Sequence, residues 1–178
     1  GVNLECTCTP YYLHETSFGD HLAWSESSAV SYANSVIGAL TNREGGPGAL
    51  AAALIGKTPC YGLHLEKNRK PQLIFNVKSD ERNWGIARYG ALGYFAGKLA
   101  GNRIPFFKGI RPDRDQLKAL GAAMAATGAV AIYHVEDITP EAKKNRYDLS
   151  GLETITITPT EIDRIFSEIH VDAVAVGC

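Results

Sequence analysis

The chain has 178 residues and a formal net charge of −1, with 45% apolar and 21% charged residues, which is typical of a globular protein with one substantial core. The near-neutral charge provides no broad basic field for nucleic acid or anionic lipid, and no apolar run is long enough to span a membrane. We therefore expect a cytoplasmic protein whose partners include neither nucleic acid nor a membrane.

Apolar periodicity and breaker residues divide the chain into helices and strands. In chain order we predict a strand (residues 2–8), an irregular segment (11–24), two helices (26–40 and 47–55), two strands (60–65 and 72–78), a helix (81–99), a strand (102–107), a helix (113–127), a strand (129–135), a short helix from residue 139, a strand (153–158), a helix (160–169) and a last strand (171–176). This alternation predicts an α/β fold with a mostly parallel sheet and helices on its faces.

Local signals refine these elements. Ser25 is the expected N-cap of the first helix, and Pro47 and Gly56 suit the first turn and the end of the second. A charged turn between the strands at 60–65 and 72–78 predicts a hairpin. Four glycines should leave a groove on helix 81–99 where another element can lie close; they are Gly85, Gly90, Gly93 and Gly97.

The chain stops directly after the last predicted strand, where a loop and a covering helix would normally follow. We therefore expect residues 1–178 to form a single α/β domain that is a fragment of a longer subunit.

A dense polar cluster separates the first two helices. Free N–H groups and the helix dipole at the start of the second helix favour an anion there, and the Arg43 guanidinium provides a planar fork for carboxylate or phosphate. We predict that a small anionic substrate is bound by a set of neighbouring residues, namely Asn34, Ser35, Thr41, Asn42 and Arg43.

Glu44 is the candidate catalytic residue of this cluster, because its carboxylate could move a proton or orient Arg43. Two structural alternatives stay open. Glu44 can pair with Arg43 as a capping salt bridge, and Asn34 and Ser35 can be small groups that allow close helix packing.

Other motifs give little support for a site. The triplet at residues 56–58 resembles the end of a phosphate loop, but Ala51 stands where that pattern requires glycine. No two histidines are spaced i,i+4 and none neighbours a C-x-x-C, so we expect no structural zinc. His64 and His134 lie in predicted apolar strands and are interpreted as hydrogen-bonded core histidines.

The four cysteines are expected to be reduced, since a chain of this size needs no disulfides. On a strand, Cys6 and Cys8 would point to the same face. Cys8 lies at the predicted strand end and is the better candidate ligand of the two. Cys178 also follows a strand, so it could converge with Cys8 at one edge of the sheet, although this spacing does not by itself establish a metal site.

Five sequence segments, taken together, point to one family. They are residues 6–11 (CTCTPY), 24–30 (WSESSAV), 32–46 (YANSVIGALTNREGG), 134–142 (HVEDITPEA) and 176–178 (VGC). In these segments the chain resembles aconitase X, the divergent branch of the aconitase superfamily, and the resemblance covers residues 4–178.

The resemblance implies an aconitase-like three-layer α/β/α fold and hydro-lyase activity. The archaeal type dehydrates mevalonate 5-phosphate to trans-anhydromevalonate 5-phosphate in isoprenoid biosynthesis, and a bacterial type dehydrates cis-3-hydroxy-L-proline. Residues 43–46 and 61–65 look more like the archaeal form, so the second activity is the alternative. The resemblance also implies that this chain is part of a large subunit whose partner is a small swivelling-domain subunit.

The resemblance further implies an iron–sulfur cluster, with [4Fe-4S] favoured, held by three cysteines. Cys8 and Cys178 match two of those ligand positions, and the third would lie outside this chain. In related aconitases the general base is a serine of the partner domain. We therefore expect the 178-residue piece alone to hold no stable cluster and to show no turnover. The alternative of another class is a non-catalytic ligand-binding or assembly module that needs partner chains.

Overall fold

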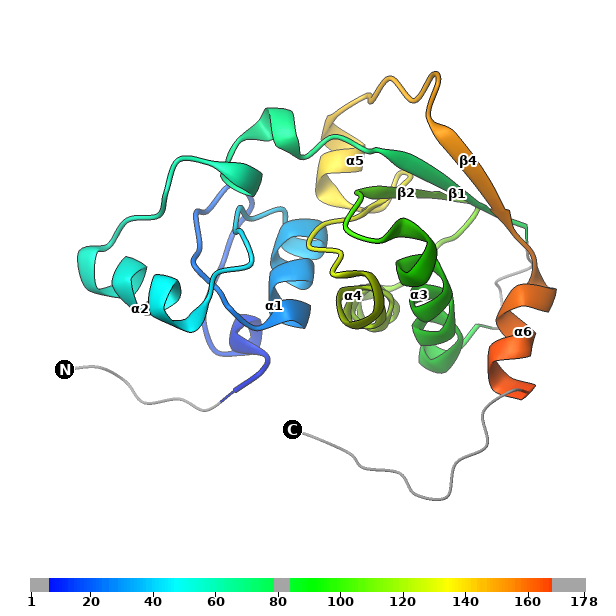
Figure 1. Cartoon of the computed structure of the whole chain (residues 1–178), viewed down its shortest axis with the longest axis horizontal. Coiled ribbons are helices and arrows are strands. Elements are labelled where there is room, and N and C mark those ends of the chain that lie inside the picture. Colours follow the sequence, from blue (N-terminus) through cyan, green and yellow to red (C-terminus); the bar gives the residue numbers. More distant parts are fainter. Residues whose placement is uncertain (1–6, 79–83, 168–178) are drawn as a thin grey trace.

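A parallel sheet organises the part of the chain that the structure, a computed structural model, describes: residues 7–78 and 84–167. Its strands are β1 (Leu73–Val77), β2 (Pro105–Lys108), β3 (His134–Val135) and β4 (Glu153–Ile157). They lie in the order β3-β2-β1-β4, and each neighbouring pair is parallel (Figure 1). The prediction of an α/β fold with a parallel sheet is confirmed.

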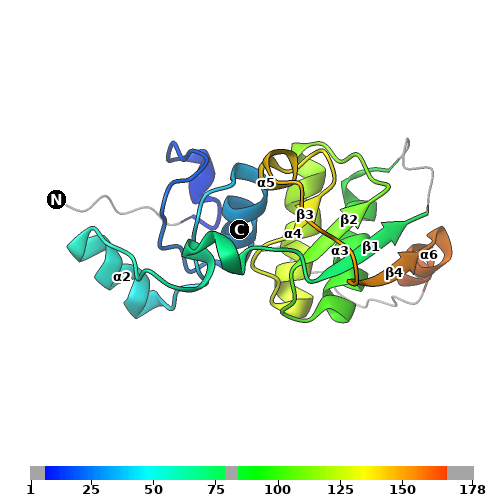
Figure 2. The ribbon, with the colours of Figure 1, turned by 90° about the horizontal axis from the view of Figure 1, so that it is seen from above.

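The helices of the described part are α1 (Ser27–Tyr32), α2 (Gly46–Ile55), α3 (Ile86–Ala100), α4 (Arg114–Gly128), α5 (Pro140–Lys144) and α6 (Pro159–Ser167). A π-helical turn, Ala33–Ile37, continues α1, and three short 3-10 turns cover Pro10–Tyr12, Gly62–His64 and Glu66–Asn68. α3, α4 and α6 cover one face of the sheet (Figure 1). α1 and α2 lie at the end of the molecule away from β4 and α6 (Figures 1 and 2). No helix of the described residues is long and apolar enough to cross a bilayer.

Close contact between α3 and α4 depends on two of the predicted glycines. A Cβ on Gly93 would lie 2.4 Å from the carbonyl oxygen of Leu120, and one on Gly97 would lie 2.1 Å from Oγ1 of Thr127. Both distances are too short for real atoms, so only glycine lets α4 approach at these points. The expected groove on α3 is therefore confirmed at Gly93 and Gly97, whereas Gly90 faces open space.

The main hydrophobic core lies between the sheet and these helices. Phe75 and Phe107 are fully buried on that face, and their ring centroids are 5.2 Å apart. On the other face, Thr154 and Thr156 of β4 are exposed. The described residues thus form one full helical layer, and the second outer layer of the expected three-layer α/β/α arrangement stays a prediction.

The predicted strand at residues 60–65 and its hairpin are wrong. This segment forms 3-10 turns, and β1 pairs with β2 and β4 instead. Gly62 has a φ of +60°, a left-handed conformation that interrupts an extended strand. The Asn42 side chain also occupies backbone groups that a strand would use, since it accepts from the Leu63 N–H at 2.7 Å and donates to the Tyr61 carbonyl at 3.2 Å.

The helix predicted over residues 26–40 is shorter than expected. It ends at Gly38, whose φ is +80° and where a Cβ would lie 2.4 Å from the Phe18 ring. Its N-cap is Glu26 rather than Ser25, because the Glu26 carboxylate accepts from the backbone N–H groups of residues 28 and 29 at 3.1 and 2.6 Å. The acidic side chain thereby satisfies two free donors of the first turn.

Most other element boundaries agree with the sequence within a few residues. α2 begins one residue earlier than predicted and ends as predicted, with Pro47 in its first turn and Gly56 left-handed at its end. The strand predicted over 129–135 shrinks to His134–Val135. Thr7 and Cys8 are not in a strand, and the remainder of the predicted strand at 2–8 and all of the strand at 171–176 lie outside the described residues.

Candidate functional site

The polar cluster between α1 and α2 is held by the chain segment that precedes α1. The two segments run side by side and form a parallel bridge between His21 and Leu40. Leu22 N–H donates to the Leu40 carbonyl at 2.9 Å, and Glu44 N–H donates to the Trp24 carbonyl at 3.1 Å. The backbone that carries Arg43 and Glu44 is therefore fixed on both sides of the cluster.

Asn34, a predicted substrate-binding residue, uses its whole side chain inside the protein. Its amide nitrogen donates to the carbonyls of Thr41 and Ala131, both at 2.9 Å. Its oxygen accepts from the Thr41 N–H at 3.0 Å and from the Arg69 guanidinium at 2.9 Å. Because this amide is buried and all of its bonds are formed, its role in the described structure is to hold the cluster in place.

Ser35, Thr41 and Asn42 are also buried. The Ser35 hydroxyl accepts from the Tyr133 N–H at 2.9 Å. The Thr41 hydroxyl donates to the Asn42 carbonyl at 2.8 Å, and the Asn42 side chain holds the turn at residues 61–63. The structure brings these predicted residues together, but as a scaffold beneath Arg43. Direct contact with a substrate stays a prediction for each of them.

Arg43 differs from these neighbours because it is exposed. Within residues 7–78 and 84–167 no hydrogen bond or ion pair engages its guanidinium, so the salt bridge with Glu44, which the sequence left open as an alternative, is not formed. Arg43 lies two residues before Gly45, the N-cap of α2, and the first turn of that helix has no side-chain cap. A fixed backbone, a charge without a partner and a free helix N-terminus together can bind a carboxylate or a phosphate.

Glu44 is half-buried, and its Oε1 is a buried atom without a hydrogen-bond partner in the described residues. Its other oxygen lies 3.2 Å from the position of a Cβ on Gly48, so the carboxylate turns back towards the first turn of α2. The helix dipole stabilises a negative charge there. A buried carboxylate oxygen without a hydrogen-bond partner has the chemistry to accept a proton or a hydroxyl hydrogen bond.

A histidine pair next to this cluster was not predicted from the sequence. The Nδ1 atoms of His21 and His64 are 2.8 Å apart, so one proton is shared between them. His64 is only 5% exposed, and its Nε2 has no partner in the described residues. Burial and the neighbouring His21 lower the pKa of His64, while the Glu44 charge opposes this shift. The two histidines are 43 residues apart in the chain, so no local spacing in the sequence indicates that they pair.

Arg69 is the second feature that the sequence did not reveal. Its side chain is almost fully buried and donates five hydrogen bonds, to Oε1 of Glu141 (2.7 Å), Oδ1 of Asn34 (2.9 Å) and the carbonyls of Asn34, Ala39 and Leu63 (3.2, 3.0 and 2.8 Å). A second contact of 2.5 Å completes the ion pair with Glu141. Arg69 thereby anchors the end of the π-helical turn and the base of the polar cluster.

His134 completes this buried network. It is 1% exposed, and its Nε2 must carry a proton because it lies 2.8 Å from the Arg69 carbonyl, which can only accept. Its Nδ1 is buried without a partner in the described part of the chain. The prediction of hydrogen-bonded core histidines is confirmed for His64 and His134, although only His134 lies in a strand.

The histidines predict a pH dependence of stability. Burial lowers the pKa of His134 below its usual 6.5, so the unfolded chain binds a proton more readily than the folded one. Stability should be complete above about pH 6.5 and should fall as the pH drops towards the folded-state pKa, by up to about 1.4 kcal/mol per pH unit. Urea unfolding at pH 8, 7, 6 and 5 measures this slope. In His134→Gln the slope should be shallower, and an unchanged slope would contradict the assignment.

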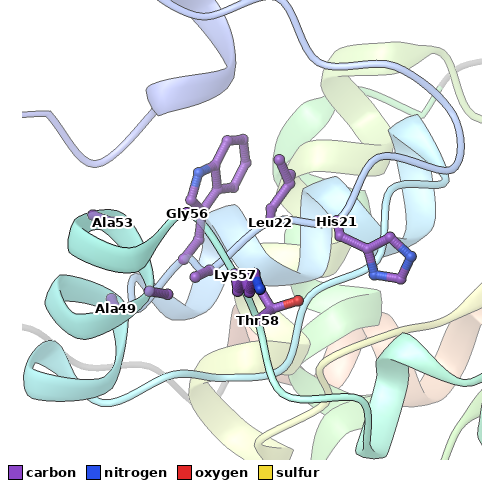
Figure 3. A pocket seen from close by; sticks show the side chains of 10 residues that line it. His21, Leu22, Ala49, Ala53, Gly56, Lys57 and Thr58 are labelled. Carbon is purple, nitrogen blue, oxygen red and sulfur yellow. The ribbon is translucent and has the colours of Figure 1, made fainter.

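A cavity of about 490 Å³ lies between α2 and the segment at residues 21–24 (Figure 3). Its lining is mostly apolar and consists of His21, Leu22, Ala23, Trp24, Ala49, Ala52, Ala53, Gly56, Lys57 and Thr58. The polar side-chain groups of the lining belong to His21, Trp24, Lys57 and Thr58. Neither Arg43 nor Cys8 lines this cavity. The hollow is thus adjacent to the polar cluster without containing it.

The described residues supply an incomplete set of ligands for an iron–sulfur cluster. Among them no three His, Cys, Asp or Glu side chains are grouped so that they could hold a metal ion. Cys8 is half-buried and Cys60 is exposed, and neither forms a disulfide. Cys178 lies outside the described residues, so its expected convergence with Cys8 stays a prediction. The role of Cys8 as one thiolate ligand of a shared cluster likewise stays a prediction.

Comparison with known families divides the chain at the segment that contains Arg69. The family model described as aconitase X first domain matches residues 1–67. The family model described as aconitase X second domain matches residues 71–167. Asn34 and Ser35 in the first match bond to Ala131 and Tyr133 in the second, and Arg69 joins both. The polar cluster therefore lies on the seam between the two matched segments.

Several curated proteins are similar over the whole chain. The phosphomevalonate dehydratase large subunit of Methanosarcina mazei is 53% identical over 100% of this chain and 45% of its own length. The corresponding subunit of Thermococcus kodakarensis is 49% identical over 100% of this chain and 47% of its own length. The cis-3-hydroxy-L-proline dehydratase of Hypocrea jecorina is 37% identical over 92% of this chain and 29% of its own length.

A solved structure agrees with these similarities. The crystal structure of Thermococcus kodakaraensis aconitase X in its holo-form has a TM-score of 0.85 and 51% identity, and the match covers 94% of this chain and 44% of that one. The chain thus spans about half the length of the phosphomevalonate dehydratase subunits that it matches over its full extent.

Proposed function

The chain belongs to the aconitase X family, and from this premise we propose that it is part of the large subunit of a hydro-lyase that dehydrates mevalonate 5-phosphate to trans-anhydromevalonate 5-phosphate. The observation that carries the proposal is 46–53% identity over nearly the whole chain to archaeal phosphomevalonate dehydratase large subunits from four organisms. The exposed guanidinium of Arg43 at a helix N-terminus suits an anionic substrate of this kind.

In this proposal the polar cluster binds and orients one anionic end of the substrate. Arg43 forms a bidentate contact with its carboxylate or phosphate, and the free N–H groups of the first turn of α2 add to that contact. Thr41 and Asn42 fix the backbone on which Arg43 is carried. Glu44 holds a proton or accepts a hydrogen bond from a substrate hydroxyl through Oε1, the atom that lacks a partner among the described residues.

An iron–sulfur cluster, with [4Fe-4S] favoured, is part of the proposal, and Cys8 and Cys178 are its proposed ligands in this chain. The third ligand would come from outside the chain. When bound, an iron with an open coordination position acts as a Lewis acid on the leaving hydroxyl. The residues described here would position the substrate for that chemistry. The proposal includes a cytoplasmic location and a place in isoprenoid biosynthesis by the mevalonate pathway.

A partner subunit completes the proposed enzyme. The relatives named above as large subunits imply a small subunit, and we propose that the partner of this chain is a swivelling domain that supplies the general base. The alternative substrate is cis-3-hydroxy-L-proline, since dehydratases named for it are 37–39% identical to this chain. The lower identity over smaller shares of the chain favours mevalonate 5-phosphate.

The proposal is tested with the full-length large subunit and its small subunit, produced anaerobically and reconstituted with iron and sulfide. We expect a brown protein that converts mevalonate 5-phosphate to a dehydrated product detectable by mass spectrometry, with little turnover of cis-3-hydroxy-L-proline. Preference for the proline substrate would replace the proposed substrate with the alternative. A colourless complex that binds a ligand without turnover would instead establish a non-catalytic binding or assembly module.

A further inference from the structure

α2 exposes its large apolar side chains and turns small ones towards the protein. The side of the helix that faces the protein carries small residues, with Ala49, Ala52 and Ala53 along the cavity described above. The large side chains of Leu50, Leu54 and Ile55 are 63%, 75% and 67% exposed. Soluble domains normally bury the large apolar side of a helix and expose a polar side. The exposed apolar side of α2 therefore lacks the covering layer that such a side normally has.

Three further observations show that the outer side of α2 is not an ordinary exposed face. None of the ten residues in Gly46–Ile55 is charged, and only Ala52 is buried. Leu50 and Leu54 are one turn apart and form a continuous stripe, which Ile55 widens. The helix also lies at one end of the molecule, away from the sheet (Figure 1). We call the stripe formed by Leu50, Leu54 and Ile55 the outer α2 face.

We propose that the outer α2 face is covered by the part of the same large subunit that lies outside this chain. This inference rests on the proposed assignment of the chain to a longer large subunit. The relatives that match the whole chain are covered to only 45–47% of their length, so more than half of such a subunit is available as a covering segment.

The character of the surface favours a covalently continuous partner. Apolar surfaces without charges are typical of permanent interfaces, which resemble a domain core cut in half. A segment of the same polypeptide covers such a face as the subunit folds, before it can associate with other molecules. The mostly apolar cavity behind α2 has room for side chains of the same covering segment, which would fill the gap left by the small residues of α2.

The test measures access to position 54 in the full-length large subunit. Leu54→Cys is treated with a maleimide under native conditions, and the labelled peptide is quantified by mass spectrometry, in the large subunit alone and in the complex with the small subunit. The matched control is Asp115→Cys, an exposed position in the first turn of α4. We expect the thiol introduced by Leu54→Cys to be labelled at least tenfold more slowly than the control thiol in the large subunit alone, at every protein concentration.

Each other outcome overturns the proposal. Rapid labelling that slows only when the small subunit is added assigns the face to that subunit. Protection that disappears on dilution assigns it to a second copy of the chain, and rapid labelling in every state means that the face is uncovered. Hydrogen exchange of residues 46–55 in the unmodified subunit gives an independent result should the variant fail to fold. Neither readout requires turnover, so a protected α2 in an inactive complex would refute the proposed function and leave this inference standing.

Discussion

Arg69→Ala is expected to lower the free energy of unfolding by about 3–5 kcal/mol, one of the largest effects available to a single substitution in this chain. The Arg69 guanidinium is buried and satisfies five acceptors, including the Glu141 carboxylate. Alanine would leave that carboxylate buried without its counter-charge and three backbone carbonyls without their donor. Unpaired buried groups of this kind cost much more than the net strength of the bonds they formed.

The location of Arg69 gives the substitution a second consequence. The side chain joins Asn34 and Ala39, in the segment matched as the first domain, to Glu141 in the segment matched as the second. Its loss should therefore loosen the seam on which the polar cluster lies, and substrate binding should weaken even where the protein remains folded. Urea unfolding followed by the fluorescence of Trp24 and Trp84 should show a transition at the seam at a lower urea concentration than in the parent protein.

Arg103→Ala is the matched control for this prediction. Arg103 also forms a close ion pair, 2.6 Å from Glu153, but its side chain and that of Glu153 are 38% and 57% exposed. Exposed pairs contribute about 0.2–1 kcal/mol, so this variant should unfold almost like the parent protein. Equal losses in the two variants would mean that burial of the Arg69 network does not determine its contribution.

The elements predicted with the most accuracy are those in which local signals agree with the tertiary environment. α4 is an example: Asp113 and Gln116 form a reciprocal capping box, and the helix lies within a residue of its predicted range. The strand predicted over 60–65 failed because its apolar residues follow a left-handed glycine, and because the backbone partners come from Asn42, about twenty residues earlier. The pattern of apolar residues within 60–65 cannot indicate that a side chain so far away in the sequence binds this backbone.

The same reason limits prediction of the site. The sequence correctly marked residues 34–44 as unusual, because hydrogen-bonding side chains are dense there. It could not separate Arg43, which is exposed, from Asn34, whose amide is saturated by residues 41, 69 and 131. Arg69 and Glu141 stand in segments that read as an ordinary charged turn and a helix start, and their pairing across 72 residues exists only in the fold.

Arg43→Ala is expected to lower kcat/KM for mevalonate 5-phosphate by about 30- to 700-fold in the reconstituted two-subunit enzyme, equivalent to about 2–4 kcal/mol. Under the proposed function, Arg43 is the exposed cation that contacts the anionic end of the substrate, and its removal leaves that charge uncompensated. Because the anion is present in both ground and transition states, the loss should fall mainly on KM. Arg43→Lys should recover only part of the affinity, since an ammonium lacks the planar fork.

The prediction for Arg43 is distinct from that for Arg69 because Arg43 contributes nothing visible to the fold. Its side chain is exposed and has no partner among the described residues, so Arg43→Ala should unfold at the parent's urea concentration. Arg146→Ala is the control, since Arg146 is also exposed and likewise lacks a partner within residues 7–78 and 84–167 but lies in the segment after α5. Removing it tests whether general positive charge attracts the substrate. A similar loss of kcat/KM in both variants would refute a specific anion site at Arg43, whereas a loss confined to Arg43→Ala, with unchanged stability, would locate the substrate's charged end at the start of α2.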